Sequence, residues 1–207
     1  MEKTPLFLHA CCGPCSLEPV RLLREEGFAP TIFWSNPNIQ PVSERDRRLE
    51  TLRAWAGFEG IEVRVGPDDR EAGERLVAPF GFDRERRCRA CYALRLRAAV
   101  EAARDAGFEA VSTTLAVSPY QLFDVCMETL QALSAHAGLK AVVRDFRPNY
   151  PDATRRSREL GMYRQNYCGC RFSAAEAQIS RQEARDARKR ERELARGARG
   201  VREEGQL

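Results

Sequence analysis

Lysine and histidine are scarce in this sequence of 207 residues. Three of its 34 basic residues are lysines (Lys3, Lys140 and Lys189) and the other 31 are arginines. Arginine pairs with phosphate groups and stacks on nucleobases better than lysine does, although the codon bias of a GC-rich genome would produce the same excess. His9 and His136 are the only histidines, and neither is placed like a member of a chelating pair. A zinc site built on paired histidines is therefore disfavoured.

Long apolar runs are also missing. No segment approaches the length needed to span a bilayer, so we expect no membrane association. The apolar run in the first ten residues is too short for the core of a signal peptide. We therefore expect a cytoplasmic protein, in which clustered cysteines are more often metal ligands or redox groups than structural disulfides.

Short apolar runs alternate with amphipathic segments along most of the chain, which predicts βαβ units and a mostly parallel, doubly wound, Rossmann-like sheet. We expect one α/β domain over residues 1–180 and a basic helical or disordered tail over 181–207. The expected strands are 5–10, 31–35, 61–65, 109–115 and 140–146. The expected helices are 16–27, 42–56, 69–79, 86–107, 121–138, 152–160 and one that starts at Ser173 with a capping box.

Seven of the eight cysteines fall into three tight groups with chelating spacing. The groups are CCGPC (Cys11, Cys12, Cys15), CRAC (Cys88, Cys91) and CGC (Cys168, Cys170). The eighth, Cys126, shares a helical face with apolar residues, which predicts a core position. A redox dithiol would account for one group alone, but three groups in one chain favour a soft-metal site.

Seven thiols exceed the four that one zinc ion or one [4Fe–4S] cluster requires. The excess indicates either a second metal or a redox-active set of thiols. Neighbouring cysteines such as Cys11 and Cys12 are expected to point apart, whereas residues three apart face one centre. Our hypothesis is a cluster held by Cys11, Cys88, Cys91 and one CGC cysteine. Cys12, Cys15 and the other CGC cysteine would hold a mononuclear iron with an open position.

A tRNA-thiolating adenylase is one alternative for this pattern. Such enzymes carry a glycine-rich loop after the first strand, which cradles pyrophosphate. Here that loop contains Pro14, which has no N–H to donate, and the run of glycines is missing. A zinc-stabilised RNA-binding module without catalysis is the other alternative.

Five motifs in order resemble the cobalamin-independent epoxyqueuosine reductases over residues 6–173. They are CCGPC, WSNPNIQPVSERDRR, RCRACYALRLR, STTLAVSPY and MYRQNYCGCRFS. The resemblance implies an adenine-nucleotide-hydrolase-like α/β fold, iron–sulfur chemistry, and reduction of the epoxide of epoxyqueuosine at the wobble position of tRNA. The metal ligands it implies are Cys11, Cys12, Cys88, Cys91, Cys168 and Cys170. Some relatives carry Asp where this chain has Cys15, a softer donor.

Reduction of an epoxide to an alkene consumes two electrons and two protons, and the chain carries no evident electron donor. We therefore expect an external low-potential donor and, as the other partner, the anticodon stem-loop of tRNA. Catalytic roles are predicted for Cys12, Cys15 and Tyr163. Loops at the carboxyl ends of the strands, and the segment before CGC, carry the predicted substrate contacts. These are Asn36, Asn38, Ser118, Tyr120, Arg164 and Gln165.

Two stretches rich in charge are weaker signals. Glu44, Arg47 and Arg48 begin an expected helix and are predicted to form a solvated face. Residues 181–200 contain eight basic and four acidic side chains in a protein of net charge +4. Such a tail either forms an exposed helix stabilised by ion pairs between successive turns or contacts the RNA backbone.

Overall fold

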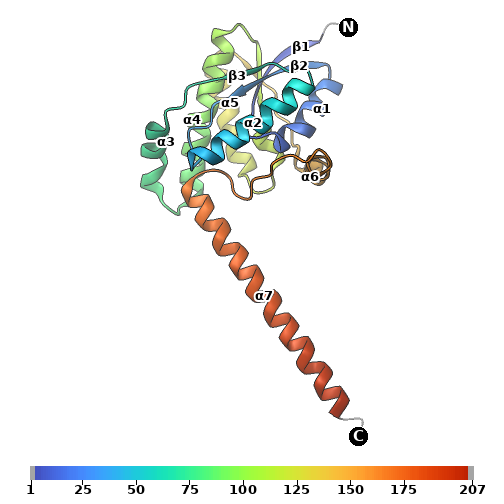
Figure 1. The fold of residues 1–207 in the computed structure, drawn as a ribbon. Coiled ribbons are helices and arrows are strands. Elements are labelled where there is room, and N and C mark those ends of the chain that lie inside the picture. Colours follow the sequence, from blue (N-terminus) through green and yellow to red (C-terminus); the bar gives the residue numbers. More distant parts are fainter. Residues whose placement is uncertain (1–2, 205–207) are drawn as a thin grey trace. The chain divides into compact units, whose positions relative to one another are not determined.

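The computed structural model describes residues 3–204, with side chains described as far as residue 193. It divides into two compact units, Met1–Gln165 and Asn166–Leu207, each described here by itself. In the first unit, five parallel strands form one sheet in the order β3-β2-β1-β4-β5 (Figure 1). The strands are β1 (Thr4–His9), β2 (Phe28–Trp34), β3 (Val63–Val65), β4 (Ala110–Thr113) and β5 (Lys140–Ala141). The predicted doubly wound parallel fold is confirmed.

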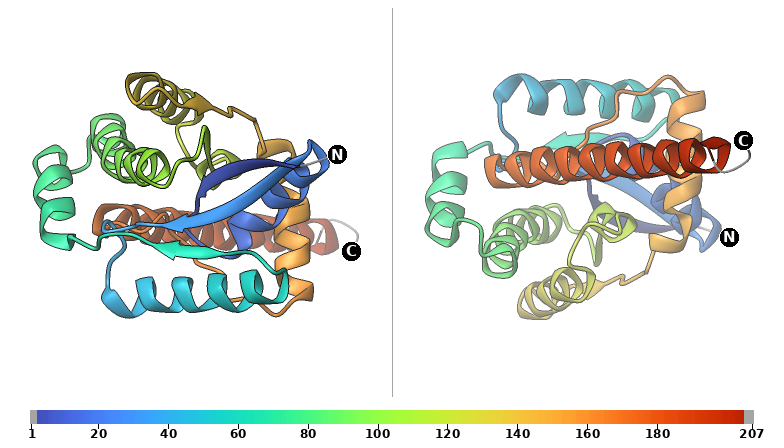
Figure 2. Two further views of the ribbon diagram at one scale, coloured as in Figure 1. Left: turned by 90° about the horizontal axis from the view of Figure 1, so that it is seen from above. Right: turned by 90° about the horizontal axis from the view of Figure 1, so that it is seen from below.

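Helices cover both faces of this sheet, and Figure 2 shows α4 and α5 on one side with α2 on the other. The α-helices are α1 (Leu17–Glu25), α2 (Val42–Phe58), α3 (Arg70–Val77), α4 (Arg84–Asp105), α5 (Phe123–His136) and α6 (Tyr150–Glu159). Short 3-10 turns connect them: η1 (Pro14–Ser16), η2 (Ala78–Phe80), η3 (Thr114–Val117) and η4 (Arg147–Asn149). None of the helices in the described part of the chain is long and apolar enough to cross a membrane.

The central strand β1 has no exposed surface from Leu6 to His9, because it lies between β2 and β4 and is covered on both faces. The strand order reverses here: β2 follows β1 on one side and β4 lies on the other. Ligands of such sheets bind outside the carboxyl ends of the strands at this switch point. The CCGPC loop leaves β1 at that point.

Several predicted boundaries are wrong. Strand β2 begins at Phe28 and not at residue 31, β3 begins at Val63 and not at residue 61, and β4 ends at Thr113 and not at residue 115. The last strand was expected over 140–146, but β5 ends at Ala141; after Val142 bonds to Val111, the chain turns, and Asp145 accepts a hydrogen bond from the Arg147 backbone N–H. In the second unit, the single helix α7 (Arg171–Glu204) begins two residues before the expected Ser173. The Ser173 hydroxyl donates to the Cys170 carbonyl and accepts from the Gly169 N–H. Ser173 therefore lies in the first turn of α7 and hydrogen-bonds back to the residues just before the helix.

Candidate metal centre at the switch point

The three thiols of CCGPC lie together. All their sulfur atoms are within 4.8 Å of one another, and the Cys11 and Cys12 sulfurs are 3.9 Å apart. The expectation that these neighbours point apart is wrong, because the chain leaves the extended conformation after Ala10 and coils into η1. The Cys15 backbone N–H donates to the Cys12 sulfur at 3.4 Å, which draws Cys12 and Cys15 onto one centre.

Gly13 allows this loop to pack closely. A Cβ atom built on Gly13 would lie 2.5 Å from the methyl carbon of Met162 and 3.3 Å from the side chain of Thr51. Any larger residue would push these neighbours away. The glycine of CCGPC therefore favours close approach to the flexible end of Met162 and to Thr51, while its backbone angles are ordinary.

The CRAC motif reaches the same region from α4. Cys91 is buried, and Arg95, one turn later, lies with one guanidinium nitrogen 4.0 Å from the Cys91 sulfur. A second nitrogen of Arg95 donates to the Asn36 side-chain oxygen at 2.6 Å. The Asn36 amide in turn donates to the carbonyl of Ala10 at 2.9 Å. This chain of contacts joins the CRAC helix to the strand end that carries CCGPC.

Hydrogen bonds among the three thiols separate their acidities. Hydrogen bonds with Cys12 and Cys15, assisted by the charge of Arg95, hold the pKa of Cys11 well below its ordinary value. Burial and the neighbouring Cys11 raise the pKa of Cys12, and hydrogen bonds with Cys11 and Cys12 raise that of Cys15. The three sulfurs together therefore favour a thiolate at one of them.

Two buried arginines lie near these thiols, and the sequence did not predict their burial. Arg48 and Arg95 are each 1 % exposed. Although burial opposes it, the charges of Cys12, Cys11 and Glu44 raise the pKa of Arg48. The prediction of a solvated face at this helix start is wrong for Arg48, because its guanidinium turns inward. Two buried positive charges suit a centre that carries several thiolates.

Glu44 links Arg48 to the predicted catalytic residue Tyr163. The Arg48 guanidinium donates to one carboxylate oxygen of Glu44 at 2.7 Å, and the Tyr163 hydroxyl donates to the other. The Arg47 guanidinium stacks on the Tyr163 ring, 4.0 Å from its centre. Burial, followed by the Glu44 carboxylate, raises the pKa of Tyr163 to about 12. The phenol therefore stays protonated at neutral pH.

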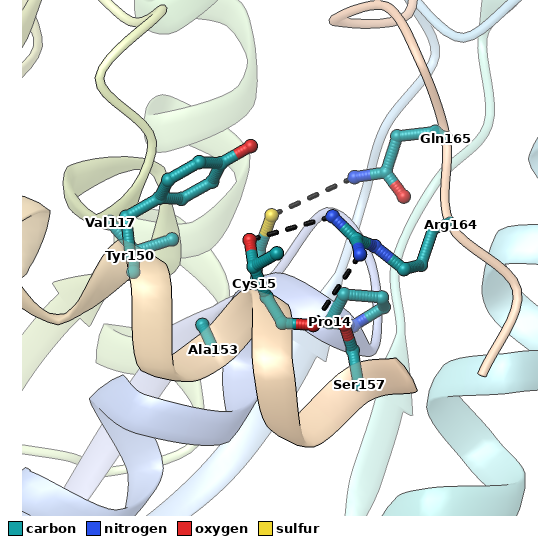
Figure 3. A pocket seen from close by; sticks show the side chains of 9 residues that line it. Pro14, Cys15, Val117, Tyr150, Ala153, Ser157, Arg164 and Gln165 are labelled. Atoms are coloured by element: carbon teal, nitrogen blue, oxygen red, sulfur yellow. Dashed lines mark hydrogen bonds between the residues drawn. The ribbon is translucent and has the colours of Figure 1, made fainter. Parts of the chain in front are cut away.

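Gln165 contacts the thiols directly. Its amide nitrogen donates to the Cys12 sulfur at 2.7 Å and to the Cys15 sulfur at 3.6 Å. Its buried amide oxygen has no hydrogen-bond partner. Figure 3 shows Gln165 and Tyr150 on two sides of the Cys15 sulfur. A cavity of about 40 Å³ lies there, also lined by Arg164 of the predicted set.

The remaining predicted contacts differ in accessibility. Both polar groups of Asn36 are engaged, as described above, whereas both amide atoms of Asn38 are buried without a partner. Ser118 accepts a hydrogen bond from the Tyr120 backbone N–H. Tyr120 itself is 71 % exposed.

Cys126 and the CGC pair complete the set of cysteines. Cys126 has no exposed surface and belongs to the apolar core, as predicted. Cys168 and Cys170 belong to the second unit, where the Ser173 backbone N–H donates to the Cys170 sulfur at 3.4 Å. Their role as ligands stays a prediction.

The donor set of the first unit fits a soft metal. Metal–thiolate bonds of about 2.3 Å in tetrahedral geometry place sulfur atoms nearly 4 Å apart. The Cys11 and Cys12 sulfurs are 3.9 Å apart, and all three CCGPC sulfurs lie within 4.8 Å of one another. No hard oxygen ligand lies among these three donors. Fold and site together define the class: a doubly wound α/β protein with a cluster of three thiols at its switch point that could hold a metal ion.

Comparisons with known proteins identify the family within this class. Residues 6–176 match the family model described as epoxyqueuosine reductase QueH. The chain is 33% identical to the epoxyqueuosine reductase QueH of Dehalococcoides mccartyi, over 83% of this chain and 93% of the relative. It is also 33% identical to that of Thermotoga maritima, over 85% of this chain and 96% of the relative. The chain belongs to the QueH family.

A solved structure supports the fold alone. The predicted subunit of a tRNA methyltransferase from Methanocaldococcus jannaschii superposes with a TM-score of 0.51 over 75% of each chain, at 11% sequence identity.

Proposed function

We propose that this protein is an epoxyqueuosine reductase that converts the epoxide of epoxyqueuosine, at the wobble position of tRNA, to the alkene of queuosine. The observation that carries the proposal is the gathering of the CCGPC thiols and buried arginines at the switch point, in a chain of the QueH family. We place the reaction in the cytoplasm, where its tRNA substrate is made.

The residues would hold a [4Fe–4S] cluster and an adjacent mononuclear iron, with ligands from Cys11, Cys12, Cys15, CRAC and CGC. When bound, these groups supply single electrons from an external low-potential donor and a Lewis acid for the epoxide oxygen. The overall change balances as epoxide plus two electrons and two protons to alkene plus water.

The chain's own residues supply position and protons in this proposal. Gln165, fixed on the thiols, retains a buried acceptor oxygen that would orient the cyclopentane diol of the substrate. Tyr163 is protonated at neutral pH and is proposed to deliver its hydroxyl proton to the substrate, which requires that this O–H leave Glu44, its acceptor in the structure. Arg48 and Arg95 compensate the negative charge of the thiolates, which is costly to bury alone.

The direct test is anaerobic incubation with epoxyqueuosine-containing tRNA and a low-potential reductant, followed by mass analysis of the nucleosides. Wild-type protein should yield queuosine, and Cys12→Ala should lose both iron and activity. The matched control is Cys126→Ala, a buried cysteine in the core, which should keep its iron and sulfide content. Zinc without iron in anaerobically purified protein would instead support a non-catalytic RNA-binding module, and ATP-dependent thiolation would support the adenylase alternative.

We also propose that the basic tail after residue 180 contacts the tRNA backbone. It contains no aromatic residue, so it would position the RNA without reading bases. Deletion of residues 181–207 should weaken tRNA binding and flatten its salt dependence while the metal content stays constant. An unchanged affinity for tRNA would show that the tail is an exposed helix without a role in RNA binding.

A further inference from the structure

One large aromatic side chain stands exposed beside the thiol cavity. Tyr120 is 71 % exposed and follows β4 and η3, at the carboxyl edge of the sheet where CCGPC also lies. Exposed aromatic rings cost free energy in contact with water, and an isolated one needs no explanation. The surroundings of Tyr120 distinguish it from such a residue.

The backbone of Tyr120 is held on both sides. Its N–H donates to the Ser118 hydroxyl at 3.3 Å, and its carbonyl accepts from the guanidinium of Arg84, on α4, at 2.7 Å. These bonds fix the ring's attachment point although the ring is exposed. A ring that is both exposed and held in place binds a flat partner with little loss of conformational entropy.

Tyr120 also connects to the cavity through a second tyrosine. Its ring meets that of Tyr150 nearly edge-on, with centroids 6.2 Å apart and planes at 85°. Tyr150 lines the cavity together with Cys15 (Figure 3). In an edge-on pair at most one face of each ring is covered, so Tyr120 keeps at least one open face.

The size of the cavity indicates what meets this open face. The cavity, of about 40 Å³, is too small to enclose the nucleotides that flank a modified base. The nucleotides on either side of that base must then lie on the surface around the opening. Proteins bind single-stranded loops of RNA chiefly by stacking such bases on aromatic rings.

We infer that Tyr120 is a stacking platform for a nucleobase next to the wobble base, and that Tyr150 forms the wall between this platform and the thiol cavity. The inference rests on the proposed function, because it presumes that an anticodon loop is the substrate. It adds a subsite that holds a neighbouring base, which need not itself be modified.

The test uses the full chain and anticodon stem-loops that carry the fluorescent base 2-aminopurine on the 5′ or the 3′ side of the wobble nucleotide. Stacking on a tyrosine quenches this fluorophore. Wild-type protein should quench one of the two probes. Tyr120→Ala should lose the quenching and bind the stem-loop at least about tenfold more weakly, whereas Tyr120→Phe should retain both.

The matched control is Phe58→Ala, which removes another exposed aromatic ring, 87 % exposed at the end of α2. This variant should bind and quench like wild type. Stem-loop binding with neither probe quenched, or equal losses in the Tyr120 and Phe58 variants, would overturn the platform and leave the proposed function standing. Quenching by wild type without epoxide reduction would overturn the proposed function and still support stacking on Tyr120. Failure to bind the stem-loop would overturn both.

Discussion

A buried carboxylate three residues after Cys15 allows a sharp test of how the site is supported. Glu18, on α1, is 2 % exposed. It accepts from Arg21 on its own helix at 2.8 Å and from Arg156 on α6 at 2.6 Å. The second contact joins α1 to α6, whose inner face lines the Cys15 cavity. We predict that Glu18→Gln destabilises the first unit.

The magnitude follows from burial and from the exposure of the partners. Removal of one member of a fully buried ion pair costs about 3–5 kcal/mol. Arg21 and Arg156 are 40% and 29% exposed, so water partly replaces the lost carboxylate. We therefore expect a loss of about 2–4 kcal/mol in the free energy of unfolding, or roughly 4–16 °C in Tm for a protein of this size.

The assay is urea denaturation followed by tryptophan fluorescence at matched metal content. Trp34 and Trp55 are both buried in the first unit, so their emission reports its unfolding without a contribution from α7. Glu25→Gln is the matched control, because Glu25 pairs with the same Arg21 at 2.7 Å but is 60% exposed. It should cost at most about 1 kcal/mol. Equal losses in the two variants would refute the argument from burial.

Two further predictions concern the site. Tyr163 should remain protonated at about pH 11, since a pKa near 12 places its ionisation above the ordinary value of about 10. Tyrosinate absorbance of wild type minus Tyr163→Phe checks this, and Glu44→Gln should lower the pKa; a wild-type transition near 10 would contradict the contact with Glu44. Arg95→Met should weaken metal retention against a chelator about tenfold, because second-shell contacts orient ligands. Arg97→Met is the control, because it removes an exposed arginine of the same helix. An equal loss of metal in this variant would show that the buried position of Arg95 does not explain its effect on metal retention.

Local patterns predicted most of the helices and strands because their signals lie within a few residues. Leu49, Leu52 and Trp55 recur at helical spacing, and all three are buried on α2. The last helix begins two residues before the predicted Ser173, because the Ser173 hydroxyl hydrogen-bonds to Gly169 and Cys170 and does not cap the helix. The predicted end of β5 was wrong because a run of apolar residues does not reveal where an edge strand stops pairing with its neighbour.

The candidate site shows the same division. The chelating spacing of the cysteines predicted ligands. The loop at a strand end predicted Tyr120 as a substrate contact, and the position just before CGC predicted Gln165. Tyr150 was missed, since a tyrosine at the start of a helix carries no signal until the fold places it beside Cys15. Helical spacing places Arg48, unlike Arg47, on the buried face of Leu52 and Trp55, but its charge predicted solvent exposure until the fold supplied the partner Glu44.

The sequence by itself determined the parallel α/β class, the chelating spacing of the cysteine groups and the resemblance to a reductase family. These depend on periodicity, spacing and motif content, all of which are read along the chain. Only the tertiary structure decided that three thiols converge within 4.8 Å, that Arg48 and Arg95 are buried around them, and that Tyr150 faces the cavity. The thiols converge through the local turn η1, whereas the placement of Arg95 and Tyr150 depends on contacts between segments dozens of residues apart. The burial of a charge is favourable only where such contacts supply its partners.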